Sequence, residues 1–189
     1  MKRHITTTLA LVLALAAPLH ADEVSDALGA AQEAYAAGDL NTAAAQITTA
    51  ARAVQALQGG KLAGFLPEAP EGWSREIDAG AGDGMAMMGM AGNMVQAHYT
   101  NAAGESFTLT LTADSPLVAQ MAGILGNPQM MAMMGKTAKI GGQDMLDQDG
   151  ALSALVGARV LVQAQGMARE AMQPVLEKMD FAGLARYDS

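Results

Sequence analysis

The sequence predicts an α+β protein in which an antiparallel helical hairpin precedes an antiparallel β-sheet that packs against helices. Three patterns predict this class. An alanine-rich segment with helical periodicity comes first, strict apolar–polar alternation follows in the middle, and short strand-like segments separated by glycine turns come later. Because the strands come in runs and do not alternate regularly with helices, α+β is favoured over α/β.

Residues 1–21 have the three-part layout of a cleaved secretory signal peptide. Lys2 and Arg3 precede an apolar run from Leu9 to Ala17, and Ala21 is a small residue of the kind found before a cleavage point. The apolar run is too short to remain as a membrane anchor. We therefore expect a soluble periplasmic or secreted chain that begins near Asp22 and is not inserted in a membrane.

Residues 22–60 are predicted to form two helices, because apolar residues recur there at spacings of three, four and seven. Gly38 interrupts the pattern, Asp39 is expected to cap the second helix, and Gly59-Gly60 are expected to end it. Two helices joined by so short a turn must pack antiparallel.

The segment AYAAGDLNTAAAQI resembles a single tetratricopeptide-type hairpin, with Tyr35, Gly38, Asp39 and Ala43 in the matching places. A peptide-binding superhelix needs several stacked repeats, and no second copy follows. The hairpin is therefore expected to pack on the other domain or to mediate self-association.

Residues 61–72 are predicted to be a linker, because Pro67 and Pro70 oppose helix and Gly72 favours a turn. The α+β domain is then expected over residues 73–184, with residues 185–189 as a tail. Its first strands are predicted in WSREID, NMVQAHYT and ESFTLTLTA, of which the last two form a hairpin.

Two helices are predicted next. Ser115 can cap the first, which has Pro116 at its first position, and Asn127 can open a second, shorter one that Gly135 ends. Four short strands, KTAKI, QDMLDQD, ALSALV and ARVLVQAQ, are then expected to form an antiparallel meander.

A C-terminal helix is predicted from the apolar stripe of Met172, Val175, Leu176 and Met179. Pro174 is expected in its first turn or at a kink.

Four short motifs, LPEAPEGW, ADSP, IGGQ and LVQAQG, occur in this order between Leu66 and Gly166. Their pattern is similar to a group of uncharacterised bacterial exported proteins and to small secreted domains of the PsbP-like kind. The resemblance implies an α+β fold and a location outside the cytoplasm. It carries no catalytic residues, since such domains are mostly binding or accessory modules.

The composition excludes several classes of function. The chain has 19 acidic and 11 basic residues and a formal net charge of −8, so it has no electrostatic footprint for nucleic acid or an anionic membrane. It has no cysteine, and His98 is the one histidine after the signal peptide, which rules out thiol chemistry and multi-histidine metal sites.

No enzymatic motif emerges either. GAGDG at residues 80–84 lacks the lysine and hydroxyl residue of a phosphate-binding loop, and no serine lies in a nucleophile elbow. The acids Asp144, Asp147 and Asp149 lack the spacing of a calcium loop and are explained by strand ends and an Asp-Gly turn. We expect a non-enzymatic protein.

Methionine is the unusual component, since ten of the 15 methionines lie between Met85 and Met134. Thioether sulfur is soft and neutral, so it favours Cu(I) over hard cations, and protons do not compete with the metal for it. The candidate ligands are Met85, Met87, Met88, Met90, Met94, His98, Met130, Met131, Met133 and Met134.

Other roles for these methionines remain open: core packing in a chain that is only 4% aromatic, buffering of oxidation, or an apolar groove for a lipid, quinone or partner helix. The sequence thus predicts a periplasmic binding or accessory protein whose methionine-rich region binds Cu(I), an apolar ligand or a partner. The alternative is a structural or assembly protein that acts through the hairpin, with methionines only packing the core.

Overall fold

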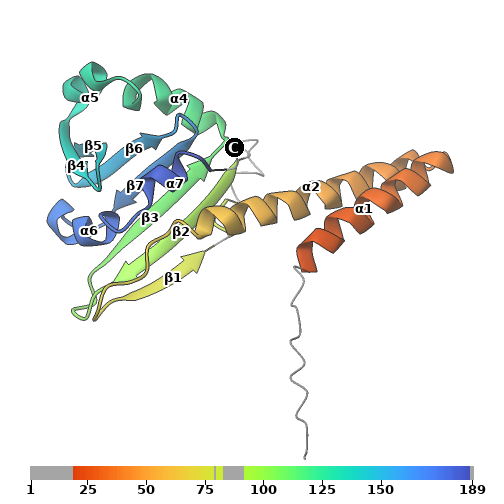
Figure 1. Ribbon diagram of the computed structural model, residues 1–189, viewed down its shortest axis with the longest axis horizontal. Coiled ribbons are helices and arrows are strands. Elements are labelled where there is room, and N and C mark those ends of the chain that lie inside the picture. Colours follow the sequence, from red (N-terminus) through yellow and green to blue (C-terminus); the bar gives the residue numbers. More distant parts are fainter. Residues whose placement is uncertain (1–18, 79, 83–91, 188–189) are drawn as a thin grey trace, which may run out of the picture. The chain divides into compact units, whose positions relative to one another are not determined.

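The computed structural model describes residues 19–78, 80–82 and 92–187 and confirms the predicted α+β class (Figure 1). The chain divides into two compact units, residues 1–53 and residues 54–189, which are described one at a time. None of the described helices combines the length and the apolar character needed to cross a lipid bilayer.

The first unit consists of helix α1 (Leu19–Ala36) and the first part of helix α2 (Leu40–Ala63), which lie side by side and antiparallel (Figure 1). Asp39 caps α2 by accepting hydrogen bonds from the Thr42 N–H at 3.0 Å and the Thr42 hydroxyl at 2.7 Å. The pKa of the Asp39 carboxyl is held below its ordinary value mainly by the hydrogen bond from the Thr42 N–H, and next by the one from the Thr42 hydroxyl. The predicted hairpin and its cap are confirmed.

Alanine forms the contact between the two helices of the hairpin. Ala27 and Ala31 on α1 and Ala43, Ala50 and Ala53 on α2 are all buried, each exposing 6% of its surface or less. Side chains this small allow close approach of the helix axes.

The prediction that Gly59-Gly60 end the second helix is wrong, because α2 continues to Ala63 and takes in part of the predicted linker. Leu62, in its last turn, is fully buried in the core of the second unit. Its burial offsets the cost of about 1 kcal/mol for each glycine in a helix.

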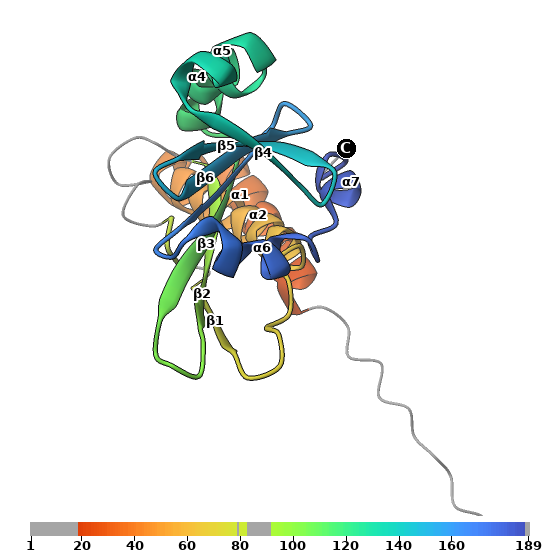
Figure 2. The same cartoon turned by 90° about the vertical axis from the view of Figure 1, so that its left-hand side faces the viewer.

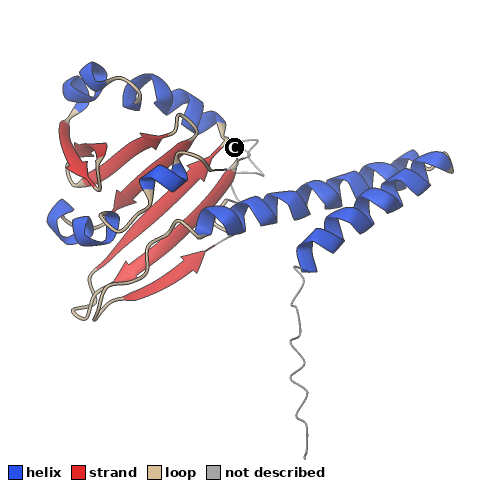
Figure 3. Cartoon of the chain, viewed as in Figure 1, coloured by secondary structure: helices blue, strands red, loops and turns tan. Residues whose placement is uncertain are grey.

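The second unit is built on an antiparallel sheet, drawn in red in Figure 3. It has seven strands in the order β1-β2-β3-β7-β6-β5-β4. The strands are β1 (Ser74–Asp78), β2 (Asn93–Thr100), β3 (Ser106–Ala113), β4 (Lys136–Ile140), β5 (Gln143–Gln148), β6 (Ala151–Val156) and β7 (Val160–Gln165). Strands β1–β3 form one meander and β4–β7 the predicted second one. The β3–β7 pair joins them, with Leu111 opposite Val162.

Helices cover both faces of this sheet (Figure 2). On one face, α6 (Arg169–Leu176), α7 (Phe181–Leu184) and the end of α2 enclose the larger core. On the other, α4 (Pro116–Leu125) and α5 (Pro128–Met134) pack on residues of β5 and β7 and form a smaller core.

Both predicted caps of α4 and α5 are confirmed. The Ser115 hydroxyl accepts a hydrogen bond from the Val118 N–H at 3.3 Å, and the Asn127 amide oxygen accepts one from the Gln129 N–H at 2.9 Å. Ser and Asn are favoured at this position because they satisfy N–H groups that have no partner within the helix.

The C-terminal region differs from the single helix that was predicted. Helix α6 ends at Leu176, with Pro174 in its last turn, and Met179 lies in the connection to α7. Tyr187, in the segment predicted as a tail, is buried, and its hydroxyl donates to the Gln58 carbonyl at 2.9 Å. The apolar stripe was recognisable, but the turn that divides it was not.

Tyr99 gives the fold a testable pH dependence. It is fully buried, and its hydroxyl donates to the Pro67 carbonyl at 2.6 Å. Burial raises the pKa of Tyr99 to about 12 from its ordinary value of 10. The neutral phenol therefore favours the folded state, and its contribution to stability is present below about pH 10 and lost as the pH rises toward 12.

We expect the free energy of unfolding to fall between pH 10 and 12 more steeply in the wild type than in Tyr99→Phe. Urea denaturation at a series of alkaline pH values measures both slopes. Equal slopes would contradict this assignment, whatever the difference in absolute stability from the lost hydrogen bond.

Candidate functional site

The predicted thioether ligands fall into two groups, and the structure describes only part of the first. Met85, Met87, Met88 and Met90 lie outside the described residues. Met94, near the start of β2, is half-buried on the sheet face that also carries His98.

Met94 and His98 cannot bind the same ion, because they are four positions apart on one extended strand, a distance of about 13 Å. His98 is exposed, and its Nδ1 lies 3.0 Å from the Thr108 hydroxyl on the neighbouring strand. A lone, exposed histidine on a sheet is explained by this cross-strand hydrogen bond. The sequence predicts both residues as candidate ligands, but the extended strand keeps them too far apart to share one ion.

The second group lies on α5, where it divides into one buried and three exposed side chains. Met131 is 3% exposed and packs in the smaller core. Met130, Met133 and Met134 expose 39%, 82% and 47% of their surface. Core packing therefore accounts for Met131 but not for the other three, which we call the α5 methionine face.

The spacing of the α5 methionine face brings its sulfur atoms within reach of one another. Met130 lies three residues before Met133 and four before Met134, so it neighbours both on the helix surface, about 5–6 Å away between Cβ atoms. The methionine side chain is unbranched and flexible, and rotation about its first two side-chain bonds allows the three sulfur atoms to converge over Met130. A set of three neutral, soft donors on one surface suits Cu(I).

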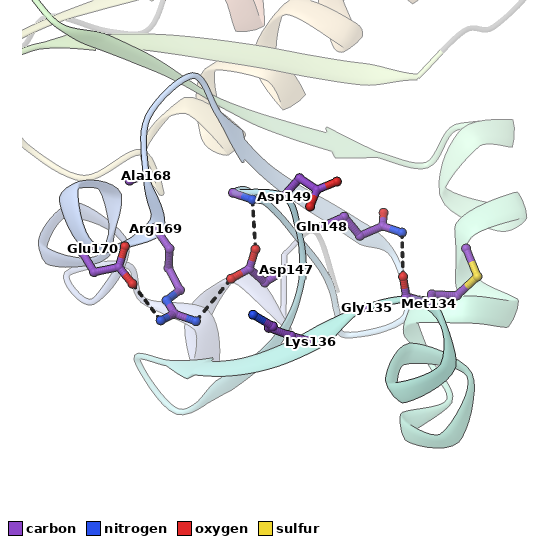
Figure 4. Close-up of a pocket in the computed structure, with 10 residues that line it drawn as sticks. Met134, Gly135, Lys136, Asp147, Gln148, Asp149, Ala168, Arg169 and Glu170 are labelled. Carbon is purple, nitrogen blue, oxygen red and sulfur yellow. Dashed lines mark hydrogen bonds and ion pairs between the residues drawn. The ribbon is translucent and has the colours of Figure 1, made fainter.

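Beside this face is a polar pocket of about 670 Å³ (Figure 4). It is lined by Met134, Gly135, Lys136, Asp147, Gln148, Asp149, Gly150, Ala168, Arg169 and Glu170. Met134 thus belongs both to the α5 methionine face and to the pocket, and its carbonyl accepts a hydrogen bond from the Gln148 side chain at 3.1 Å.

Ion pairs hold the far wall of this pocket. The Arg169 guanidinium lies 3.2 Å from Asp147 and 2.7 Å from Glu170, and Asp147 also accepts the Gly150 N–H at 3.1 Å (Figure 4). The pKa of Glu170 is lowered, first by its own N–H and then by Arg169. Because the guanidinium pairs with both carboxylates, the wall is best explained as structural.

The carboxylates do not form a metal site of their own. Within residues 19–78, 80–82 and 92–187, no group of three or more His, Cys, Asp or Glu side chains is placed to hold a metal ion. The predicted Asp-Gly turn is confirmed, since Asp149 and Gly150 have φ of 54° and 89°. The pairing of Asp147 with Arg169 was missed, because the two residues lie on separate elements with no local pattern to link them.

Comparison with known proteins does not add to this geometry. The chain matches no described protein family, and no curated protein or solved structure is significantly similar to it.

Proposed function

We propose that this protein is exported and acts outside the cytoplasm as a non-enzymatic Cu(I)-binding protein, with Met130, Met133 and Met134 as ligands. The observation that carries the proposal is the division within α5. One methionine anchors the helix in the core, and the other three are exposed together at spacings that make them neighbours.

The chemistry of the ligand set supports Cu(I) over other ions. Thioethers are poor ligands for hard cations, and the absence of cysteine from the sequence leaves methionine as the soft donor of the chain. Thioether sulfur carries no proton at any physiological pH, so a methionine site keeps its affinity where histidine and thiolate sites lose theirs. Such a site suits a compartment whose pH is not controlled.

The proposed location rests on the sequence of the first 21 residues, with its basic start, apolar run and small residue at Ala21. A binding role without catalysis is supported by the methionine surface itself, because thioethers neither transfer protons nor act as general bases.

The proposal is tested by anaerobic titration of the chain from Asp22 to Ser189 with Cu(I) in competition with a coloured Cu(I) chelator. The triple variant Met130→Leu, Met133→Leu, Met134→Leu is expected to bind Cu(I) at least about 100-fold more weakly, since each substitution removes a ligand. Leucine keeps the apolar volume and removes the sulfur, so folding is preserved.

Two controls make the result specific. Met131→Leu alters the same helix at its buried residue and is expected to leave Cu(I) affinity unchanged. The wild-type affinity should also be the same at about pH 5 and pH 7, across the range in which histidine titrates.

Two outcomes would overturn the proposal. The first is equal affinity in the wild type and the triple variant. The second is loss of affinity only when Met85, Met87, Met88 and Met90 are changed to leucine, which would assign binding to that segment and not to α5.

A further inference from the structure

The hairpin of the first unit has its small residues inside and its large apolar residues outside. Alanines form the contact between α1 and α2, whereas Leu28, Tyr35, Leu40 and Ile47 expose 52%, 70%, 65% and 57% of their surface. Leu28 and Tyr35 are seven residues apart on α1, and Leu40 and Ile47 are seven apart on α2. Each pair therefore lies along one side of its helix.

Both pairs lie on the same side of the hairpin. At about 100° per residue, Leu28 and Tyr35 lie roughly a quarter turn round α1 from the buried alanines, and Leu40 and Ile47 lie roughly a quarter turn round α2 in the same sense. When two helices are antiparallel, residues that are rotated in the same sense from the helix contact lie on the same flank of the hairpin. We call these four residues the hairpin apolar face.

The opposite flank bears out this geometry. Asp26 on α1 and Thr49 on α2 lie about a quarter turn the other way from the alanines, and they line one shallow pocket together. Asp22 and Glu23 line the same pocket, so this flank of the hairpin is acidic.

The hairpin apolar face carries no charge. The charged residues between Asp22 and Ala53 are Asp22, Glu23, Asp26, Glu33, Asp39 and Arg52. By the same rotation, Asp26, Glu33 and Arg52 are turned toward the other flank, and Asp39 lies in the turn. An uncharged face with four large apolar side chains is unusual on an acidic protein and favours burial by association.

We propose that the hairpin apolar face is a dimerisation surface that binds the same face of a second copy of this chain, forming a four-helix bundle. Two copies that each carry a formal net charge of −8 repel one another, and they can meet closely only through a face without charge. An apolar face can bind the same face of a second copy, as a two-fold interface requires.

The size of the face fits a dimer of modest stability. The stretch from Asp22 to Ala36 is about 22 Å long, and two packed helices are about 18 Å wide, which makes roughly 400 Å² in projection. At roughly 400 Å² on each partner, the face is smaller than the ~800 Å² that each partner buries in a standard interface, so the dimer is expected to be weak. A membrane is a poor alternative, since surface helices that bind lipid carry basic residues on the polar face, and this hairpin is acidic.

The test is the molar mass of the chain from Asp22 to Ser189 by sedimentation equilibrium, at protein concentrations up to about 100 μM. We expect the wild type to dimerise and Ile47→Glu, or Leu28→Glu on the other helix, to raise the dimer dissociation constant by at least about tenfold. Ala45→Glu adds the same charge to the exposed opposite flank of α2 and should leave the dimer intact.

A monomeric wild type would overturn the proposal, as would a dimer that persists in Ile47→Glu. If the wild type is monomeric and Ile47→Glu also lowers its melting temperature, the face is covered by another part of the same chain and not by a second copy. Circular dichroism of each variant separates loss of dimer from loss of helix. Cu(I) affinity in the monomeric variants tests the α5 site independently.

Discussion

Phe107→Ala is expected to lower the free energy of unfolding by about 3–5 kcal/mol, the range for removal of a buried aromatic ring. Phe107 is 2% exposed and lies between two other rings. It stacks on Tyr99 with ring centroids 4.9 Å apart, and its centroid lies 6.0 Å from that of Trp73 in a T-shaped pair. The substitution therefore removes apolar burial and two ring contacts that link β2, β3 and the segment before β1.

Chemical denaturation followed by far-UV circular dichroism measures this loss, and Trp73 fluorescence provides a local probe. Thr108→Ala, at the adjacent half-buried position of β3, is the matched control and should cost much less. A loss below about 1 kcal/mol for Phe107→Ala would contradict the ring packing described above.

Leu62→Ala is expected to cost about 2–5 kcal/mol, although alanine favours helix more than leucine does. Leu62 is fully buried at the end of α2 and packs into the larger core with residues of the sheet and of α6. Because helix propensity changes in the opposite direction, a loss of this size can only come from packing.

Denaturation of the chain from Asp22 to Ser189 measures the effect, with Gln55→Ala as the control at an exposed position of the same helix. That control should lie within about 0.5 kcal/mol of the wild type. Near-neutral behaviour of Leu62→Ala would show that the end of α2 is not part of the core, and that the predicted end at Gly59-Gly60 is the better description.

Local patterns were sufficient to predict the strands of the second unit and its helices α4 and α5. The alternation of Phe107, Leu109 and Leu111 with threonines is a strand signal that needs no tertiary information. Ser115 and Asn127 predicted the starts of α4 and α5, because capping is a short-range interaction that the local sequence determines. The α+β class followed from the order of these elements.

Long-range interactions set what the sequence did not reveal. Three features had no local signal in the sequence. They are the pairing of β3 with β7, the extension of α2 through Gly59-Gly60, and the ion pair of Arg169 with Asp147. The methionines illustrate the same limit. Met130 and Met131 are adjacent and chemically identical, and only the packing of α5 makes one exposed and the other buried.

The strand order of the sheet also constrains when the chain can fold. The second strand that pairs with β3 is β7, which comes much later in the chain. Helices α6 and α7, which cover the face of the larger core, come after β7. A chain that is still emerging during synthesis therefore has β1–β3 with an unpaired edge and an uncovered apolar side, a state prone to aggregation. Complete folding of this unit therefore requires the chain through α7, since its central pairing is non-local.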